Sequence, residues 1–121
     1  MKSIKLLDCT LRDGGYYNRW DFSENLIINY LNCMKNCSVD YIELGFRTLK
    51  NVGFKGPCAY SKDEFINSVV KFSEPKIGIM INGSEILNNY QYSEKNVKNL
   101  FPSKIKSRLK LVRIACHYEE I

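Results

Sequence analysis

The segment LLDCTLRDGGYYNRWDF, residues 6–22, brings charged side chains to the point where an apolar run ends. Arg12 and Asp13 stand side by side there, and Gly14 and Gly15 follow them. A carboxylate at a strand end can hold a divalent cation, because Mg²⁺ and Mn²⁺ prefer oxygen ligands. A neighbouring guanidinium can hydrogen-bond a substrate carbonyl and stabilise the enolate that forms from it. The alternative for this pair is an ion pair that only holds a loop in place.

Three further ionisable residues lie in or after apolar runs. Glu43 is inside the run DYIELGF, where a carboxylate is costly to bury unless it is paired. Arg12 and Arg113 are the candidate partners, and both a structural ion pair and a catalytic role are open for Glu43. His117 follows the run LKLVRIA, and a lone histidine is more often a hydrogen-bonded structural residue than a ligand or base. The sequence has no Ser-His-Asp spacing, phosphate loop or dinucleotide fingerprint.

The elements that position these residues can be read from the spacing of apolar side chains. The pattern predicts strands over residues 4–9, 40–46, 76–81 and 109–115, and helices over residues 24–36, 61–73 and 93–101. Ser23 fits the N-cap of the first helix, and Ser61 with Glu64 fits a capping box for the second. The segment from residue 12 to residue 22 is expected to be a loop.

Strands that alternate with helices predict an α/β fold with a parallel sheet and right-handed crossovers. In such folds, active sites gather where the carboxyl ends of the strands meet. The residues at or just after the expected strand ends are 8–13, 43–47, 82 and 113–117. We therefore expect Arg12, Asp13, Glu43, Arg113 and His117 at one end of the sheet.

Composition limits the class of protein. The 121 residues suffice for one domain, and 45% hydrophobic with 26% charged residues is typical of a globular chain. No apolar stretch approaches the ~18 residues of a membrane span, and the first residues lack the apolar run of a signal peptide. A cytoplasmic location is therefore the default expectation, with no membrane partner.

The formal net charge is +5, and its one local enrichment is the series Lys104, Lys106, Arg108 and Lys110. We interpret this series as a solvated connector rather than a nucleic-acid site, because no nucleic-acid-binding motif accompanies it. Five cysteines occur without a CxxC pair: Cys9, Cys33, Cys37, Cys58 and Cys116. Most are expected to be buried, reduced thiols, whereas Cys9 and Cys116, at strand ends, can line a pocket.

The segments LLDCTLRDGG, YIELGFR and LVRIACHYEE resemble the first, second and fourth strands of the DRE-type metal-dependent TIM-barrel family. That family includes 4-hydroxy-2-oxovalerate aldolase, HMG-CoA lyase, and the isopropylmalate and homocitrate synthases. The D-x-TLRDGG opening is most similar to the aldolase branch. The resemblance covers essentially all 121 residues. Because a full (β/α)₈ barrel needs ~250 residues, residues 1–121 would form the amino-terminal half, a partial TIM barrel of about four strands.

The resemblance implies a role for each of the residues at the strand ends. Asp13 would be a ligand of a divalent metal, Mn²⁺ or Mg²⁺, and Arg12 would steady the enolate oxygen of a pyruvate-like intermediate. Glu43 would belong to the polar floor beside Arg12. Arg113 and His117 would line the same mouth and bind substrate. The implied reaction makes or breaks a carbon–carbon bond beside a ketone, with the metal as a Lewis acid.

Two departures from the family pattern bear on this expectation. Family members bind the metal with an H-x-H pair on a late strand, whereas this chain has one histidine in all. Characterised aldolases also carry an acid–base histidine in the loop after the RDG motif, and here that loop reads GYYNRWDF. Tyr16 or Tyr17 is the available substitute, with Tyr17 the candidate catalytic residue, although a phenol of pKa ~10 is a poor base at neutral pH.

The sequence therefore predicts an aldolase or lyase domain that acts on a 2-oxo acid and is incomplete in this chain. The isolated chain should bind metal weakly and be inactive. An open sheet edge after the fourth strand predicts self-association or pairing with a complementary barrel half. The alternatives are a non-catalytic α/β module that binds a partner or a small acid, and a flavodoxin-type fold, whose first loop would be richer in serine and threonine.

Overall fold

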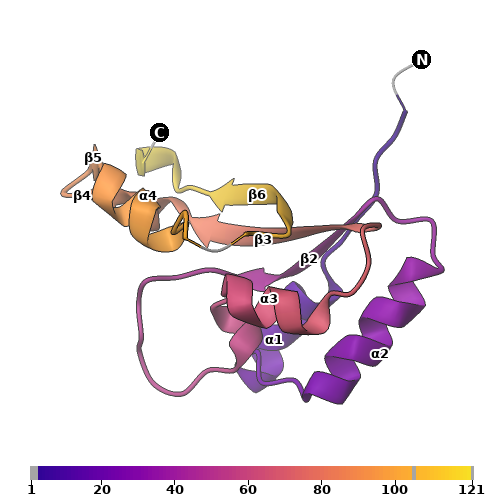
Figure 1. The fold of residues 1–121 in the computed structure, drawn as a ribbon. Coiled ribbons are helices and arrows are strands. Elements are labelled where there is room, and N and C mark those ends of the chain that lie inside the picture. The colour runs from indigo at the N-terminus through magenta and orange to yellow at the C-terminus, as the bar shows by residue number, and fades with distance from the viewer. Residues whose placement is uncertain (1–2, 105, 121) are drawn as a thin grey trace.

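A four-stranded parallel sheet forms the centre of the computed structural model, which describes residues 3–104 and 106–120 (Figure 1). Its strands, in spatial order, are β1 (Leu7–Asp8), β2 (Tyr41–Phe46), β3 (Lys76–Asn82) and β6 (Leu109–Ala115). Each neighbouring pair is parallel. Four parallel strands that alternate with helices confirm the predicted fold class, a partial barrel of the α/β type.

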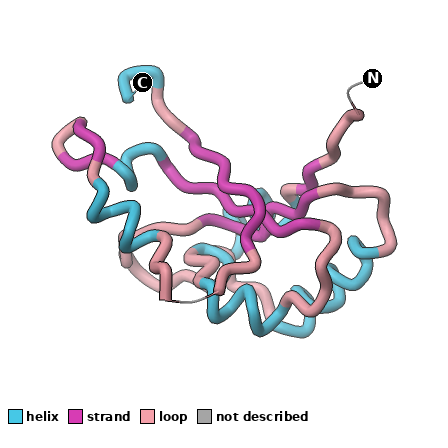
Figure 2. Tube along the Cα trace, turned by 45° about the horizontal axis from the view of Figure 1, so that its top comes forward, coloured by secondary structure: helices cyan, strands magenta, loops and turns pink. Residues whose placement is uncertain are grey.

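Helices connect these strands, as the tube in Figure 2 shows. The α-helices are α1 (Thr10–Asn18), α2 (Glu24–Lys35), α3 (Asp63–Val69) and α4 (Glu94–Leu100). Three short 3₁₀ helices are η1 (Pro57–Ala59), η2 (Gly83–Ile86) and η3 (Tyr118–Glu120), and β4 (Leu87–Asn88) pairs with β5 (Gln91–Tyr92) in a small antiparallel hairpin. Among the described residues, every helix falls short of the length and apolarity that a bilayer-spanning helix needs.

Two of the predicted helix starts are confirmed by their caps. The hydroxyl of Ser23 accepts a hydrogen bond from the backbone N–H of Leu26 at 3.3 Å, and α2 begins at the next residue. Ser93 accepts one from the N–H of Asn96 at 3.3 Å and so starts α4. In each case the side-chain oxygen satisfies a backbone donor that the first helical turn leaves without a partner.

The expected loop over residues 12–22 is wrong for residues 12–18, because α1 begins at Thr10 and continues to Asn18. The carboxylate of Asp8 accepts hydrogen bonds from the backbone N–H of Thr10 at 3.1 Å and from its hydroxyl at 2.9 Å, which fixes the start of the helix. Both Gly14 and Gly15 belong to this helix. A Cβ on Gly15 would lie 1.9 Å from Cδ1 of Trp20, so this glycine serves close packing rather than chain reversal.

The expected capping box at Ser61 and Glu64 is also wrong. Ser61 is buried and donates its hydroxyl hydrogen bond to the carbonyl of Cys58 at 3.1 Å, so it is not available to cap. The helix α3 begins at Asp63 instead and ends at Val69, four residues earlier than predicted. The S-x-x-E pattern did not predict the helix start, because the serine hydroxyl contacts the Cys58 carbonyl instead of the first turn of the helix.

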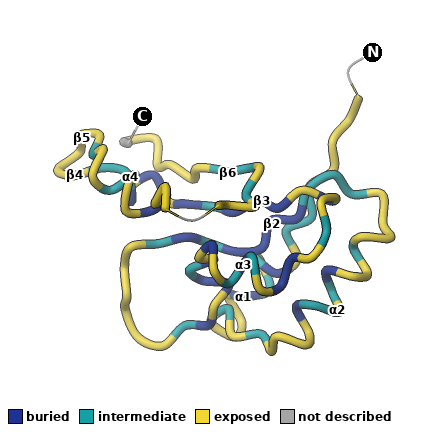
Figure 3. Tube along the Cα trace, in the orientation of Figure 1, coloured by how far each residue is buried: buried dark blue, intermediate teal, exposed yellow. Residues whose placement is uncertain are grey.

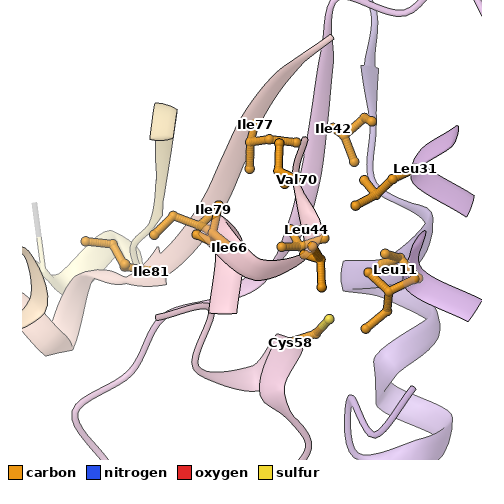
Figure 4. Close-up of a cluster of buried hydrophobic side chains, with 12 residues drawn as sticks. Leu11, Leu31, Ile42, Leu44, Cys58, Ile66, Val70, Ile77, Ile79 and Ile81 are labelled. Carbon is orange, nitrogen blue, oxygen red and sulfur yellow. The ribbon is translucent and has the colours of Figure 1, made fainter. Parts of the chain in front are cut away.

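The core lies between the sheet and the helices α1, α2 and α3, which pack against the same face of β2 and β3 (Figures 1 and 4). Its buried members are Leu11, Ile27, Leu31, Ile42, Leu44, Cys58, Ile66, Val69, Val70, Ile77, Ile79 and Ile81.

The prediction that most cysteines are buried is wrong, because Cys33, Cys37 and Cys116 are exposed and Cys9 is half-buried. Burial raises the pKa of the Cys58 thiol to about 12.

The strand β6 forms one edge of the sheet and is its most exposed long strand (Figure 3). Side chains alternate between the two faces of a strand, so Val112 and Ile114 point away from the face that carries Arg113. Both are exposed, Ile114 by 51%. At the opposite edge, Ile4 and Leu6 were expected to belong to the first strand, but they precede β1 and are exposed.

Candidate functional site

Glu43 is the centre of a charged cluster at the sheet face opposite the core. Its side chain has no exposed surface and belongs to the middle of β2. Arg113, on β6, donates to it from Nε and Nη2, each at 2.7 Å, and Arg12, on α1, donates from Nε at 2.8 Å. The structure thus brings together three predicted residues that lie 31 and 70 positions apart in the sequence.

Arg12 also contacts its neighbour Asp13. Nη1 of Arg12 lies 2.7 Å from Oδ1 of Asp13, so the same guanidinium contacts two carboxylates. The Arg12 side chain is mostly buried, whereas that of Asp13 is 62% exposed at the rim. The guanidinium carbon of Arg12 lies 5.8 Å from the centre of the Phe46 ring, which gives it an aromatic contact on a further side.

The charges of this cluster stabilise one another. Burial alone would raise the pKa of Glu43, but hydrogen bonds from Arg113 and Arg12 outweigh it, so the pKa is lowered from its ordinary value. The pKa of Arg113 is raised, chiefly by its hydrogen bond to Glu43. Burial raises the pKa of the Cys9 thiol, and the Glu43 carboxylate raises it further. The lowered pKa keeps Glu43 ionised beside its two arginines.

A second set of contacts fixes the start of α1 behind the cluster. The hydroxyl of Tyr30, on α2, donates a hydrogen bond to the Asp8 carboxylate, which also holds Thr10. Burial and this carboxylate raise the pKa of Tyr30. Nη2 of Arg113 lies 3.6 Å from the sulfur of Cys9, which adds a thiol to the contacts of this guanidinium. Asp8 thus positions the helix that carries Arg12.

Tyr17 does not join the cluster. It is 94% exposed, whereas Tyr16 packs edge-on against Trp20, with ring centres 4.8 Å apart. Successive residues of an α-helix point about 100° apart, so the contact of Tyr16 directs Tyr17 into solvent. A loop at this segment would have left both tyrosines free to face the site.

His117 follows β6 and lines a small open cavity together with Asn82, Ser84 and Cys116. This places the histidine at the carboxyl ends of β3 and β6, as the sequence predicted, and it also confirms that Cys116 lines a pocket. The side chains of the cluster centred on Glu43 do not line this cavity.

Arg47 was one of the charged residues expected at the strand ends, but it is a buried structural residue. It donates from Nη2 to Asp63 Oδ1 at 3.1 Å and to the Ser61 carbonyl at 2.6 Å, and from Nη1 to the Leu100 carbonyl at 3.1 Å. It thereby joins the end of β2 to the start of α3 and the end of α4.

Sequence reasoning missed a ring cluster and a buried carboxylate beside the site. Trp20, Tyr16 and Phe46 pack edge to face, with the centres of Trp20 and Phe46 5.5 Å apart. Glu85 is buried and accepts hydrogen bonds from the Thr48 hydroxyl and from the backbone N–H of Leu49. The one signal for the ring cluster is the single tryptophan of the chain, which follows the RDGG motif.

The described residues do not form a metal site by themselves. No group of three or more histidine, cysteine, aspartate or glutamate side chains converges within residues 3–104 and 106–120. Asp13 provides one oxygen donor of the kind that Mn²⁺ and Mg²⁺ prefer, and its carboxylate contacts Arg12. A single carboxylate does not form a complete site for either ion, because both take about six oxygen ligands.

The arrangement can recognise an anion. Each guanidinium carries five N–H groups, and Glu43 uses one of Arg12 and two of Arg113. With Asp13, which takes a further N–H of Arg12 at the exposed rim, the cluster has two guanidiniums and two carboxylates and is formally neutral. The N–H donors that Glu43 and Asp13 leave unused suit a carboxylate or a developing enolate oxygen.

Comparison with known proteins gives a consistent class. No protein-family model and no curated protein matches the chain. Among solved structures, it is similar to the crystal structure of "the N-terminal domain of a putative aldolase from Bacteroides vulgatus", with 31% sequence identity and a TM-score of 0.77. The match covers 92% of this chain and 35% of that one. The chain therefore has an aldolase-like fold and spans about a third of the length of that solved chain.

Proposed function

We propose that this chain is the amino-terminal part of an aldolase-type catalytic domain that makes or breaks a carbon–carbon bond beside the ketone of a 2-oxo acid. The observation that carries the proposal is the convergence of Arg12 and Arg113 on the buried Glu43. Guanidinium N–H donors that a buried carboxylate holds in place, in an aldolase-like fold, can stabilise the negative charge of an enolate intermediate.

In this proposal each residue of the cluster has a distinct task. Arg12 donates to the ketone oxygen and stabilises the negative charge that develops there as the enolate forms. Arg113 binds the carboxylate of the 2-oxo acid, and His117 contributes to binding from the neighbouring cavity. Glu43 holds both guanidiniums in place and stays ionised, so it is a positioning residue. Tyr17, which points into solvent, has no part in the step.

Asp13 is the proposed ligand of a divalent cation, Mn²⁺ or Mg²⁺, which would polarise the substrate carbonyl when bound. The remaining ligands would come from water, from a second chain or from further sequence of a longer protein. We also propose that the unit acts with a second copy or a complementary barrel half. Two open sheet edges favour this, because exposed edges pair readily with other strands.

The metal role of Asp13 is tested by paramagnetic broadening of amide signals on titration with Mn²⁺. We expect weak, saturable broadening around residues 12 and 13 that is lost in Asp13→Ala. Glu64→Ala, which removes an exposed carboxylate from α3, should leave the broadening unchanged. Equal broadening in the wild-type and Asp13→Ala chains would remove the metal from the proposal.

The substrate role of the cluster is tested by titration with pyruvate, the simplest 2-oxo acid, followed by the same amide signals. Shifts should centre on Arg12, Glu43 and Arg113. Arg113→Lys should weaken binding about tenfold, because lysine cannot replace the two-pronged contact of an arginine with a carboxylate. Shifts that spread evenly over surface lysines would contradict a specific site.

A further inference from the structure

A cavity of about 240 Å³ lies beside the charged cluster and has no part in the proposed reaction. Its wall is built by the rings of Tyr16, Trp20 and Phe46, and Val52 and Ala59 add further apolar surface. Sites for drug-sized molecules begin at roughly 300 Å³. This cavity therefore suits one ring with a short side chain.

Trp20, at the centre of the ring wall, is positioned by a hydrogen bond and by close packing. The indole Nε1 of Trp20 donates a hydrogen bond to the Arg12 carbonyl at 2.9 Å, and its ring lies directly over Gly15. Arg19 and Trp20 both have left-handed backbone angles, with φ of 60° and 59°. Two consecutive non-glycine residues in this region store strain, which persists where the surroundings over-determine the conformation and is frequent at ligand sites.

The charge at the cavity is positive. Lys50 and Lys55 line it, and the ammonium nitrogen of Lys55 lies 5.8 Å from the centre of the Trp20 ring. The one carboxylate in the lining, Glu85, is already engaged by Thr48 and by the N–H of Leu49. An anion with an apolar body therefore matches both the rim and the wall.

Apolar side chains around the cavity are exposed to solvent. Tyr16 and Val52, which both line the cavity, are exposed. A small ligand would cover part of this surface and make ring contacts with the wall, which are worth more than burial of the same area against aliphatic groups.

We propose that this cavity binds a small aromatic carboxylate, with its ring against Tyr16, Trp20 and Phe46 and its carboxylate toward Lys55. Phe46 contacts Arg12 on one side and lines this cavity on the other. The cavity can thus receive the part of a substrate that is remote from the reacting carbons. That use as a substrate subsite rests on the proposed function, whereas binding of the aromatic carboxylate does not.

The test follows the indole N–H signal of Trp20 in a ¹⁵N-labelled chain, which holds a single tryptophan. Three probes are titrated without divalent metal: phenylacetate, its neutral counterpart phenylacetamide, and acetate. Phenylacetate should shift the signal in a saturable way and bind about tenfold more tightly than either of the others, as expected for one charged contact. No saturable shift with phenylacetate would overturn the proposal.

Variants separate the ring contact from the charge contact. Lys55→Gln should abolish the preference for phenylacetate over phenylacetamide, whereas Lys35→Gln, on the exposed side of α2, should keep it. Phe46→Leu should weaken both aromatic probes. A preference that survives Lys55→Gln would overturn the assignment of the carboxylate contact. Because no metal or 2-oxo acid is present, failure of the proposed function would leave these results unchanged.

Discussion

Glu43 keeps its charge at a place that water does not reach, and two arginines from distant elements make this possible. Removal of one partner from a buried ion pair leaves an uncompensated charge, which costs more than the pair itself contributes. Glu43 therefore ties α1, β2 and β6 together, since Arg12 and Arg113 both direct their Nε–H groups to this one carboxylate.

Glu43→Gln should lower the free energy of unfolding by about 3 kcal/mol near neutral pH. The folded chain lowers the pKa of Glu43, so its contribution is present above the ordinary value of 4.5 and is lost as pH falls below it. The difference between wild type and variant should therefore shrink in acid. Urea unfolding followed by Trp20 fluorescence measures it at each pH.

A matched control is Asp40→Asn, which breaks the pair with Lys5 at the protein surface. It should change stability much less, because exposed ion pairs are screened by solvent. A difference between wild type and Glu43→Gln that stays constant through the acid range would contradict the assigned role of Glu43.

At this scale the sequence predicted the charged cluster better than its surroundings. The sequence could place Arg12, Glu43 and Arg113 together, because the carboxyl ends of parallel strands all lie at the same end of the sheet. The positions of Tyr17 and Trp20 could not be predicted, because they depend on α1 being a helix and on a ring that packs over Gly15. The burial of Glu85 could not be predicted from the sequence, because its hydrogen-bond partners are a hydroxyl and a backbone N–H from another loop.

Among the elements, α1 decides the geometry of the site. It carries Arg12 and Asp13 at its start and Tyr16 on the face that meets Trp20. Its two adjacent glycines have different environments: a Cβ on Gly14 would meet only Phe22, at 3.8 Å, whereas one on Gly15 would collide with the Trp20 ring.

Alanine substitutions at Gly14 and at Gly15 should therefore have opposite effects on stability. Gly14→Ala should stabilise the chain by about 0.5–1 kcal/mol, because alanine favours the helix interior. Gly15→Ala gains the same helix propensity but must displace Trp20, so it should destabilise the chain and shift the tryptophan emission to the red. Denaturant unfolding measures both, and equal effects of the two changes would contradict the packing described.

The elements themselves were largely predictable where local signals decide. Ser23 and Ser93 cap the helices that follow them, and the apolar runs of β2, β3 and β6 form strands within a residue of their predicted bounds. The hairpin of β4 and β5 was missed because strands of two residues carry no periodicity. The capping box predicted at Ser61 does not form, because the Ser61 hydroxyl donates a hydrogen bond to the Cys58 carbonyl instead.

In the molecule as a whole, the sheet is covered by helices on one face and is open at both edges. The outward side chains of β6, Val112 and Ile114, are apolar and exposed. Exposed apolar edge strands pair with other strands unless charge, twist or cover prevents it.

We therefore expect the chain to associate with a second copy as its concentration rises. The double variant Val112→Lys, Ile114→Lys should remain monomeric, because two charges on the edge strand oppose pairing. Sedimentation velocity over a concentration series measures this, with Tyr90→Lys on the β4–β5 hairpin as a control that adds charge elsewhere. A wild-type chain that is monomeric throughout would refute self-association.

The loop between β2 and η1 is fastened at both of its ends. Arg47 fixes its beginning through Asp63 and Ser61, and the backbone N–H of Gly56 donates to the Arg19 carbonyl at 2.9 Å at its end. Changes of length between such fixed points cost little, since the entropy of loop closure grows only slowly with length. Residues 48–55 can therefore vary in length and composition, and with them the ligand preference of the proposed cavity that Lys50, Val52 and Lys55 line, while the sheet and its helices stay the same.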